Sequence, residues 1–200
     1  MLPEPELIRF LKRVRLIRAD GPFHRFADLR FVHQQLSVGR GTEVLRGLGA
    51  KMNGGRFTPR DAFETLYVAT TAETARIEAE SWLTASGVIG VPARPYVHFL
   101  VRGRLQSVLD LTDGSVLRAL GTTVEEMCAP WVMQQMRGIE AATQLLGRMV
   151  HAARRIEGIL FVSSKDRPHG RCLAILPDRL KKGSALEVAD DTGLVREKLP

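Results

Sequence analysis

The sequence predicts one compact domain of the α+β class. The chain has 200 residues, which is enough for one hydrophobic core but too few for two independent ones. Apolar residues make up 44% and charged residues 26%, values that are typical of folded proteins and exclude extensive disorder. Candidate strands and helices alternate without a regular β-α-β rhythm, so we expect a mixed sheet flanked by helices.

The N-terminal segment predicts a basic amphipathic helix within residues 6–18. Leu7, Leu11 and Val14 fall on one stripe, and Arg and Lys side chains surround it. Such helices can bind membranes, RNA or acidic proteins, but most pack their apolar side on their own domain.

The expected organisation has three parts. Residues 1–20 form a helical extension, and residues 21–180 form the domain, which begins after the turn chemistry of Asp20-Gly21-Pro22. Residues 181–200 are polar, and we expect them to be a loosely attached tail.

The central stretch predicts a turn, a strand and a helix in succession. A glycine pair precedes Arg56, which permits positive φ and a close approach of the backbone to a ligand. A short apolar run around Tyr67 predicts a buried strand. Thr70, with Glu73 three residues later, is typical of a helix N-terminus. The predicted helix carries Glu78.

Glu78 falls on the apolar face of that helix, between Ala75 and Trp82. A carboxylate on an inward face is costly unless it has a charged or hydrogen-bonding partner, and Arg56 is the partner we expect. From the residues alone, a structural ion pair and an active-site carboxylate explain this pattern equally well.

The remaining elements follow from periodicity and turn residues. The glycines between Gly39 and Gly49 predict a flexible loop, and they do not form a nucleotide-binding fingerprint. Further on, we expect strands at 96–101, 105–111, 158–162 and 172–176, short helices after Gly114 and Thr123, and a buried helix within 139–155.

Charge and cysteine content narrow the class of partner. A net charge of +7 favours anionic partners such as nucleic acid, a phosphate-bearing small molecule or an acidic protein. The two cysteines, Cys128 and Cys172, are far apart and have no ligand spacing, so we expect neither a metal site nor a disulfide. No stretch has the pattern of a signal peptide or a membrane span, so we expect a cytoplasmic protein without a membrane partner.

Several blocks of the sequence, taken in order, resemble the RES-domain family, the toxin components of bacterial toxin–antitoxin modules. Gly54-Gly55-Arg56-Phe57 matches the family's glycine-glycine-arginine-aromatic motif, Tyr67 its strand tyrosine and Glu78 its helix glutamate. Thr58 stands where the family usually has Asn. The blocks Val108–Asp113, Thr143-Gln144 and Gly158–Ser163 resemble the remaining family blocks.

The resemblance implies an ADP-ribosyltransferase-like fold, a split mixed sheet flanked by helices with NAD+ in a cleft. It implies catalytic roles for Arg56, Tyr67 and Glu78, with no metal. The residues implied to bind NAD+ are Gly55, Arg56, Tyr67, Ser163 and an early-strand arginine, for which Arg25 is the candidate. Ser163 fits the spacing of the family serine better than Ser164.

Each residue type suits cleavage of the bond between nicotinamide and ribose. The Arg56 fork can hold the pyrophosphate through paired hydrogen bonds. The Tyr67 ring can stack on the nicotinamide or the ribosyl cation, with its hydroxyl free to bond. Glu78 can bind ribose hydroxyls and stabilise the positive charge that develops on the ribose. No nucleophile-elbow motif surrounds Ser163, so we expect it to bind substrate.

The function we expect is a toxin that depletes NAD+ by hydrolysis or phosphorolysis of that bond, with inorganic phosphate as a co-substrate in the second case and no cofactor. An alternative is transfer of ADP-ribose to a host protein. A second alternative, from another class, is an RNA-binding or RNA-cleaving toxin, although the chain lacks the aromatic-rich or basic repeats of RNA platforms, so we do not expect direct nucleic-acid binding. The expected partners are an Xre-like, DNA-binding antitoxin and, as an option left open, a second copy of the chain in a homodimer.

Overall fold

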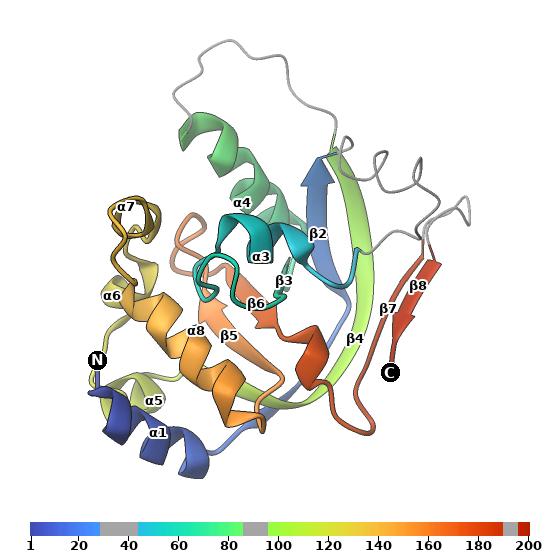
Figure 1. Cartoon of the computed structure of the whole chain (residues 1–200). Helices are drawn as coiled ribbons and strands as arrows, with labels where there is room; N and C mark the ends of the chain where they lie inside the picture. Colours follow the sequence, from blue (N-terminus) through green and yellow to red (C-terminus); the bar gives the residue numbers. More distant parts are fainter. Residues whose placement is uncertain (29–43, 86–95, 190–195) are drawn as a thin grey trace.

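The computed structural model describes residues 1–28, 44–85, 96–189 and 196–200 (Figure 1). The strands are β1 Ile17–Asp20, β2 Phe23–Asp28, β3 Leu66–Ala69, β4 Tyr96–Asp110, β5 Gly158–Val162, β6 Arg171–Ile175, β7 Ala185–Ala189 and β8 Arg196–Leu199. The helices are α1 Glu4–Arg13, α3 Leu48–Asn53, α4 Ala72–Ala85, α5 Gly114–Ala119, α6 Val124–Cys128, α7 Val132–Met136 and α8 Ala142–Ala153, with a short 3-10 helix, η1, at Pro177–Arg179.

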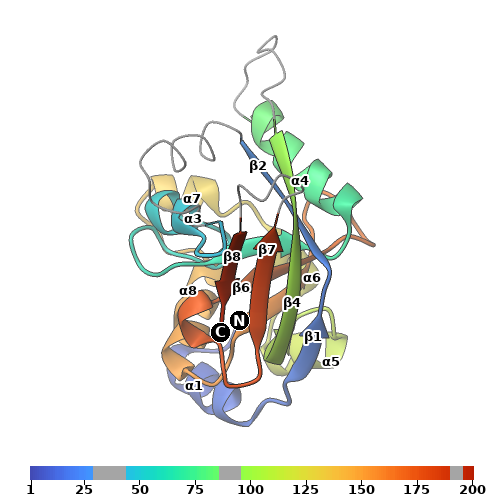
Figure 2. The ribbon, with the colours of Figure 1, turned by 90° about the vertical axis from the view of Figure 1, so that its right-hand side faces the viewer.

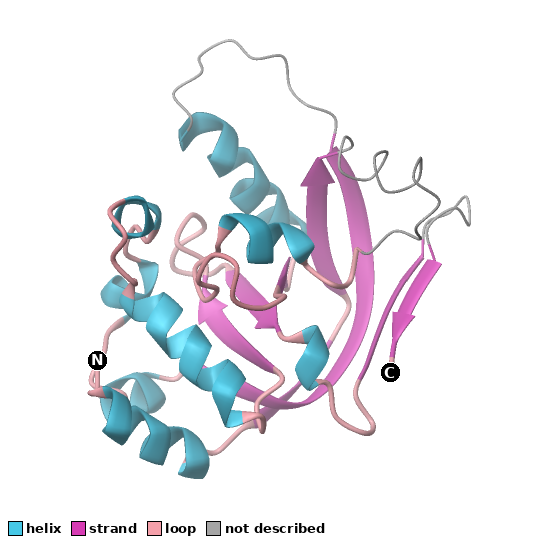
Figure 3. Ribbon diagram, in the orientation of Figure 1, coloured by secondary structure: helices cyan, strands magenta, loops and turns pink. Residues whose placement is uncertain are grey.

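These strands form one mixed sheet in the order β2-β3-β6-β5-β4-β7-β8, and β1 pairs with β4. β4 and β5 are parallel, whereas the other described pairs are antiparallel. The helices gather mainly on one side of the sheet, and Figure 3 shows this segregation in cyan and magenta. The predicted α+β class, a mixed sheet flanked by helices, is confirmed.

The long strand β4 joins two parts of this sheet. In its first half Val101 is opposite Phe23 of β2 and Val188 of β7, whereas in its second half Val108 is opposite Ile17 of β1 and Gly158 of β5. Because β2 also pairs with β3, the five strands β2, β3, β6, β5 and β4 form a closed circuit of pairings. The circuit requires strong curvature, which accords with the natural twist of sheets.

Two hydrophobic cores result from this arrangement. One lies between the sheet and the helices, where Leu11, Leu146 and Phe161 are buried in a single cluster. The other contains the side chains on the opposite faces of the strands, including Leu66 and Val101. Successive residues of a strand point to opposite sides, so each strand serves both cores.

Both terminal regions contribute strands to the sheet. We had expected residues 1–20 to be a helical extension outside the domain and residues 181–200 to be a loosely attached tail. Residues 1–20 include β1, and α1 packs on α8 with Leu7 and Leu11 buried. Residues 181–200, expected to be loose, supply β7 against β4 and then β8 against β7 (Figure 2). The physical reason is the alternation Leu186-Glu187-Val188, which buries the two apolar side chains completely and turns the half-buried Glu187 to the other face of the strand.

Three local predictions also need correction. Leu48–Asn53 is the helix α3, although the glycines on its N-terminal side suggested a loop; residues 39–43 lie outside the described part. The two expected strands at 96–101 and 105–111 are the single strand β4, which continues through Gly103. The cap of α4 is Thr71, whose Oγ1 accepts a hydrogen bond from the Thr74 backbone at 3.1 Å, not Thr70. Among the described helices, none has the length and apolar character needed to cross a membrane.

Candidate functional site

Strand β3 places Tyr67 at the centre of the candidate site. Leu66 and Val68 point into the core between the strands, so Tyr67 points to the other side, toward the helices. Its ring makes an edge contact with Phe161 of β5, with centroids 6.5 Å apart. The half-buried position of Tyr67 is therefore fixed by the sheet register.

Arg56 lies on a tight turn next to this strand. The Gly55 backbone N–H donates to the Thr58 carbonyl at 2.8 Å, and Gly54 has a φ of 81°, which favours glycine. A Cβ on Gly55 would lie 2.7 Å from the Tyr67 hydroxyl oxygen, closer than van der Waals contact allows. The predicted need for the glycine pair thus has a physical reason: the turn sits directly against Tyr67.

The Arg56 guanidinium reaches the end of α6. Nη1 donates to the carbonyls of Met127 and Ala129 at 2.7 and 3.1 Å, and Nη2 donates to Ser164 Oγ at 2.8 Å. Carbonyls at a helix C-terminus lack partners within the helix, so a cation there is favourable. A guanidinium has five N–H donors, and the described contacts of Arg56 use three. The other two can bind an anion.

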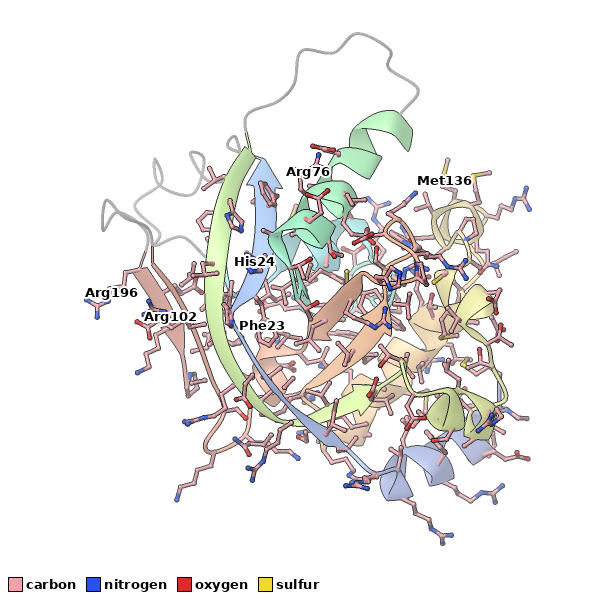
Figure 4. All side chains as sticks on the ribbon, turned by 180° about the vertical axis from the view of Figure 1, so that it is seen from behind. Phe23, His24, Arg76, Arg102, Met136 and Arg196 are labelled. Carbon is pink, nitrogen blue, oxygen red and sulfur yellow. The ribbon has the colours of Figure 1, made fainter. Side chains whose placement is uncertain are left out.

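Helix α4 brings Glu78 to the same region. Ser163 Oγ donates to Glu78 Oε1 at 2.5 Å, a short, charge-assisted hydrogen bond. The outer side of the helix carries the exposed ion pairs of Arg76 with Glu73 and Glu80, and Figure 4 shows Arg76 projecting away from the sheet. The predicted inward orientation of Glu78 agrees with this arrangement. We expected Arg56 to be its partner, but the described hydrogen bond to Glu78 comes from Ser163.

Two neighbouring serines connect Glu78 and Arg56. Ser163 is fully buried, and its Oγ also accepts from the backbone N–H groups of Lys165 and Asp166. A hydroxyl has one donor and two acceptor sites, so the described contacts of Ser163 occupy all of them. Its position therefore suits orienting Glu78 better than the predicted binding of substrate. Ser164, left as the alternative, contacts Arg56 instead.

The Tyr67 hydroxyl is also occupied, whereas we expected it to be free. It accepts a hydrogen bond from the Phe57 backbone N–H at 2.8 Å and lies 3.0 Å from Thr58 Oγ1. Burial raises the pKa of Tyr67 to about 12, against the opposing effect of these hydrogen bonds. The phenol stays neutral at physiological pH, so the ring is the part of Tyr67 available to a ligand.

Arg25, the remaining predicted binding residue, lies elsewhere. Phe23 of the same strand belongs to the core between the strands, so Arg25 points to that side, opposite to Tyr67. Its Nη1 donates to the Val44 carbonyl at 3.1 Å. Burial lowers the pKa of the Arg25 guanidinium, and the nearby Glu197 carboxylate opposes this shift. The structure brings together Gly55, Arg56, Tyr67, Glu78 and Ser163 but not Arg25.

Several groups at the site were not singled out by sequence reasoning. Gln144 of α8 is buried and bonds to the turn that carries Arg56, and its only sequence signal was its place in a family block. The carbonyls of Met127 and Ala129 carry no signal, because any residue has a carbonyl. Cys128 lies between them, and burial raises the pKa of its thiol. Within the described residues, no three His, Cys, Asp or Glu side chains are grouped as metal ligands.

The chain folds into a mixed sheet, and three candidate residues meet on one side of it: Arg56 on a turn, Tyr67 on a strand and Glu78 on a helix. Ser163 and Ser164 lie between Glu78 and Arg56. Residues 15–196 match the family model of the RES domain, and the chain belongs to the RES-domain family. It is also similar in structure to a chain from the crystal structure of the M. tuberculosis MbcT–MbcA toxin–antitoxin complex, with a TM-score of 0.66 and 20% sequence identity over 95% of this chain and 92% of that chain. The search of curated proteins gave no match.

Proposed function

We propose that this protein is a toxin that consumes NAD+ by cleaving the bond between nicotinamide and ribose. The observation that carries the proposal is the link from Glu78 through Ser163-Ser164 to Arg56, which sets a carboxylate and a guanidinium with two unused donors on neighbouring elements. A cation for the diphosphate and a carboxylate for the ribose are the two charges that NAD+ cleavage requires.

The reaction needs little acid catalysis from the protein. The C1′–N1 bond breaks with its electron pair going to the nicotinamide nitrogen, so a positively charged ring leaves as a neutral base. The ribose carbon becomes oxocarbenium-like and is attacked by the oxygen of water, which loses a proton, or of phosphate. Glu78 stabilises the positive charge on the ribose, and the hydrogen bond from Ser163 holds its carboxylate in one orientation. Arg56 binds the diphosphate, and the Tyr67 ring borders the nicotinamide.

Incubation of the purified protein with NAD+ and, separately, with total RNA tests the proposal. We expect free nicotinamide and unchanged RNA length, and ¹⁸O-labelled water distinguishes hydrolysis from phosphorolysis by labelling the released ADP-ribose. Glu80→Gln is the matched control for Glu78→Gln, because Glu80 lies on the outer side of the same helix. Shortened RNA without nicotinamide release would favour the RNA-cleaving alternative.

We further propose that the protein acts with an antitoxin, as in the complex to which it is structurally similar. The family resemblance points to an Xre-like protein with a DNA-binding domain, and the net charge of +7 favours an acidic contact surface on it. Expression of the chain alone should arrest growth and lower cellular NAD+, and co-expression with the protein encoded next to it should restore both. Normal growth at high expression of the active protein would contradict the toxin role.

A further inference from the structure

The turn that carries Arg56 is braced from two sides by buried polar side chains. We propose that Thr58, the Tyr67 hydroxyl and Gln144, together called the Arg56 clamp, are positioning residues that set Arg56 for binding the diphosphate of the substrate. This inference deepens the proposed function and rests on it. It gives Tyr67 a second role through its hydroxyl, separate from the contact of its ring with a ligand.

The side of the clamp that faces β3 is a chain of hydrogen bonds with a defined direction. Thr58 Oγ1 donates to Thr65 Oγ1 at 2.8 Å, which uses its single proton. The 3.0 Å contact between Thr58 Oγ1 and Tyr67 Oη must then be donated by the tyrosine. Tyr67 Oη in turn accepts from the Phe57 N–H, so one phenol holds the backbone of one residue and the side chain of the next, both directly after Arg56.

The side of the clamp that faces α8 holds the carbonyls of the same turn. Gln144 Nε2 donates to the Gly55 carbonyl at 3.1 Å and lies 3.4 Å from the Thr58 carbonyl. Helix and turn are in direct contact there, because a Cβ on Gly147 would lie 1.8 Å from the Phe57 carbonyl oxygen. The turn therefore has little freedom to move away from β3 or toward α8.

The third constraint acts on the side chain of Arg56 itself. Nη1 of Arg56 donates to the carbonyls of Met127 and Ala129, so these carbonyls fix one end of the guanidinium while the turn fixes the backbone of the same residue. Thr58, Thr65 and Gln144 are at most 2% exposed, and among the described buried side chains no polar atom lacks a hydrogen-bond partner. Small displacements at such a site lower activity strongly, by about a hundredfold for 1 Å in unfavourable cases.

Substitutions that preserve shape separate positioning from mere stability. Thr58→Val and Tyr67→Phe each remove one hydroxyl of the clamp while keeping its volume, and Thr58→Ser restores the hydroxyl. Thr65→Val is the matched control, because it removes an equally buried hydroxyl whose described hydrogen bond is to Thr58 and not to the turn backbone or to Tyr67. All four variants are compared at equal folded concentration.

In kinetic assays with NAD+, we expect Thr58→Val and Tyr67→Phe each to raise KM about tenfold while kcat changes less than about threefold, because diphosphate binding contributes equally to ground and transition states. The double variant should be no worse than Tyr67→Phe, because that single change already removes both hydrogen bonds of the Tyr67 hydroxyl, including the contact with Thr58. Thr58→Ser should restore KM, and Thr65→Val should leave it within about twofold of the wild type. A fall in kcat at unchanged KM would overturn the proposal.

A measurement without substrate keeps this inference separate from the proposed function. Hydrogen exchange of the Phe57 amide should accelerate about fivefold or more in Tyr67→Phe, because this variant lacks the hydroxyl that accepts from the amide. Thr58→Val keeps that hydroxyl but removes its contact with Thr58, so a smaller acceleration is expected there, and none in Thr65→Val. The Ser107 amide, which donates to the distant Glu157, serves as the internal standard. Unchanged exchange at Phe57 would overturn the clamp, whereas accelerated exchange in a protein without NAD+ turnover would contradict only the proposed function.

Discussion

Glu157 and Glu78 both face the interior, but they differ in the groups that donate hydrogen bonds to them. The difference distinguishes a structural carboxylate from a candidate catalytic one. Glu157 is fully buried between β4 and the segment before β7, and its carboxylate accepts hydrogen bonds from the backbone N–H groups of Gln106, Ser107 and Lys181 at 2.7 to 2.8 Å. Glu78 is half-buried, and its described hydrogen bond comes from a side chain, Ser163. The first carboxylate connects three backbone segments, and the second is bonded to Ser163, whose neighbour Ser164 is bonded to Arg56.

The comparison teaches that burial of a carboxylate does not by itself indicate an active site. Burial disfavours ionisation of Glu157, but the hydrogen bonds from Ser184, Lys181, Ser107 and Gln106 outweigh this effect and lower its pKa. Such a group is satisfied by the protein and has no capacity left for a ligand. Glu78 differs in its setting, because Ser163, which donates to its carboxylate, is followed in the chain by Ser164, which accepts from Arg56.

The outer side of the sheet provides a further contrast. Arg102 of β4 and Arg196 of β8 project from the side of the molecule opposite to α7, where Met136 is labelled (Figure 4). Basic side chains there are solvated, whereas Arg56 is fixed by three hydrogen bonds. The net charge alone therefore does not locate the anion site.

The largest effect should come from Glu78. Glu78→Gln keeps the shape of the side chain but removes its charge, so NAD+ turnover should fall by about a thousandfold while the unfolding free energy changes by less than about 1 kcal/mol. Turnover is measured as nicotinamide released per folded molecule, with Glu80→Gln as the control. A variant that unfolds yet keeps its activity per folded molecule would make Glu78 structural, like Glu157.

The converse result is expected for Glu157. Glu157→Gln presents an amide N–H₂ to backbone donors, and leaving such donors unsatisfied should lower the unfolding free energy by about 3 kcal/mol. Urea denaturation measures this loss, and activity per folded molecule should match the wild type. A selective loss of turnover at normal stability would extend the functional site to Glu157.

A smaller effect is expected for the arginine. Arg56→Lys retains the charge but loses the fork that contacts two carbonyls, a serine and an anion together, so kcat/KM for NAD+ should fall about thirtyfold, mainly through KM. Arg60→Lys is the control, because Arg60 lies on the surface four residues further along. Equal kinetics for the two variants would remove Arg56 from the site.

The smallest effect concerns pH. The pKa of Glu157 is lowered in the folded protein, so its contribution to stability is fully present above the ordinary pKa of 4.5 and is lost as the pH falls through the folded value. The difference in unfolding free energy between wild type and Glu157→Gln should therefore shrink as the pH falls below the ordinary pKa of 4.5. A difference that is constant with pH would show that charge contributes nothing to the role of Glu157.

Local patterns in the sequence were sufficient for most elements and for the turn, the strand and the helix that carry the candidate site residues. The glycine pair before Arg56, the apolar run around Tyr67 and the helical spacing of Glu78 each depend on near neighbours, and the structure places all three as predicted. The strand Gly158–Val162 is also as predicted. The α+β class followed from the irregular order of such elements.

What the sequence by itself determined was the local element that carries each candidate group, because periodicity and turn chemistry act over a few residues. Only the tertiary structure decided which of them are committed to each other: Ser163 to Glu78, Ser164 to Arg56, and the Tyr67 hydroxyl to the turn before Thr58. It also placed Arg25 on the opposite side of the sheet and drew residues 181–200 into it. These outcomes depend on strand register and on pairing between segments up to about a hundred residues apart. A register shift of one residue would turn every side chain of a strand to the opposite face of the sheet. The local sequence pattern of the strand would be the same in both registers.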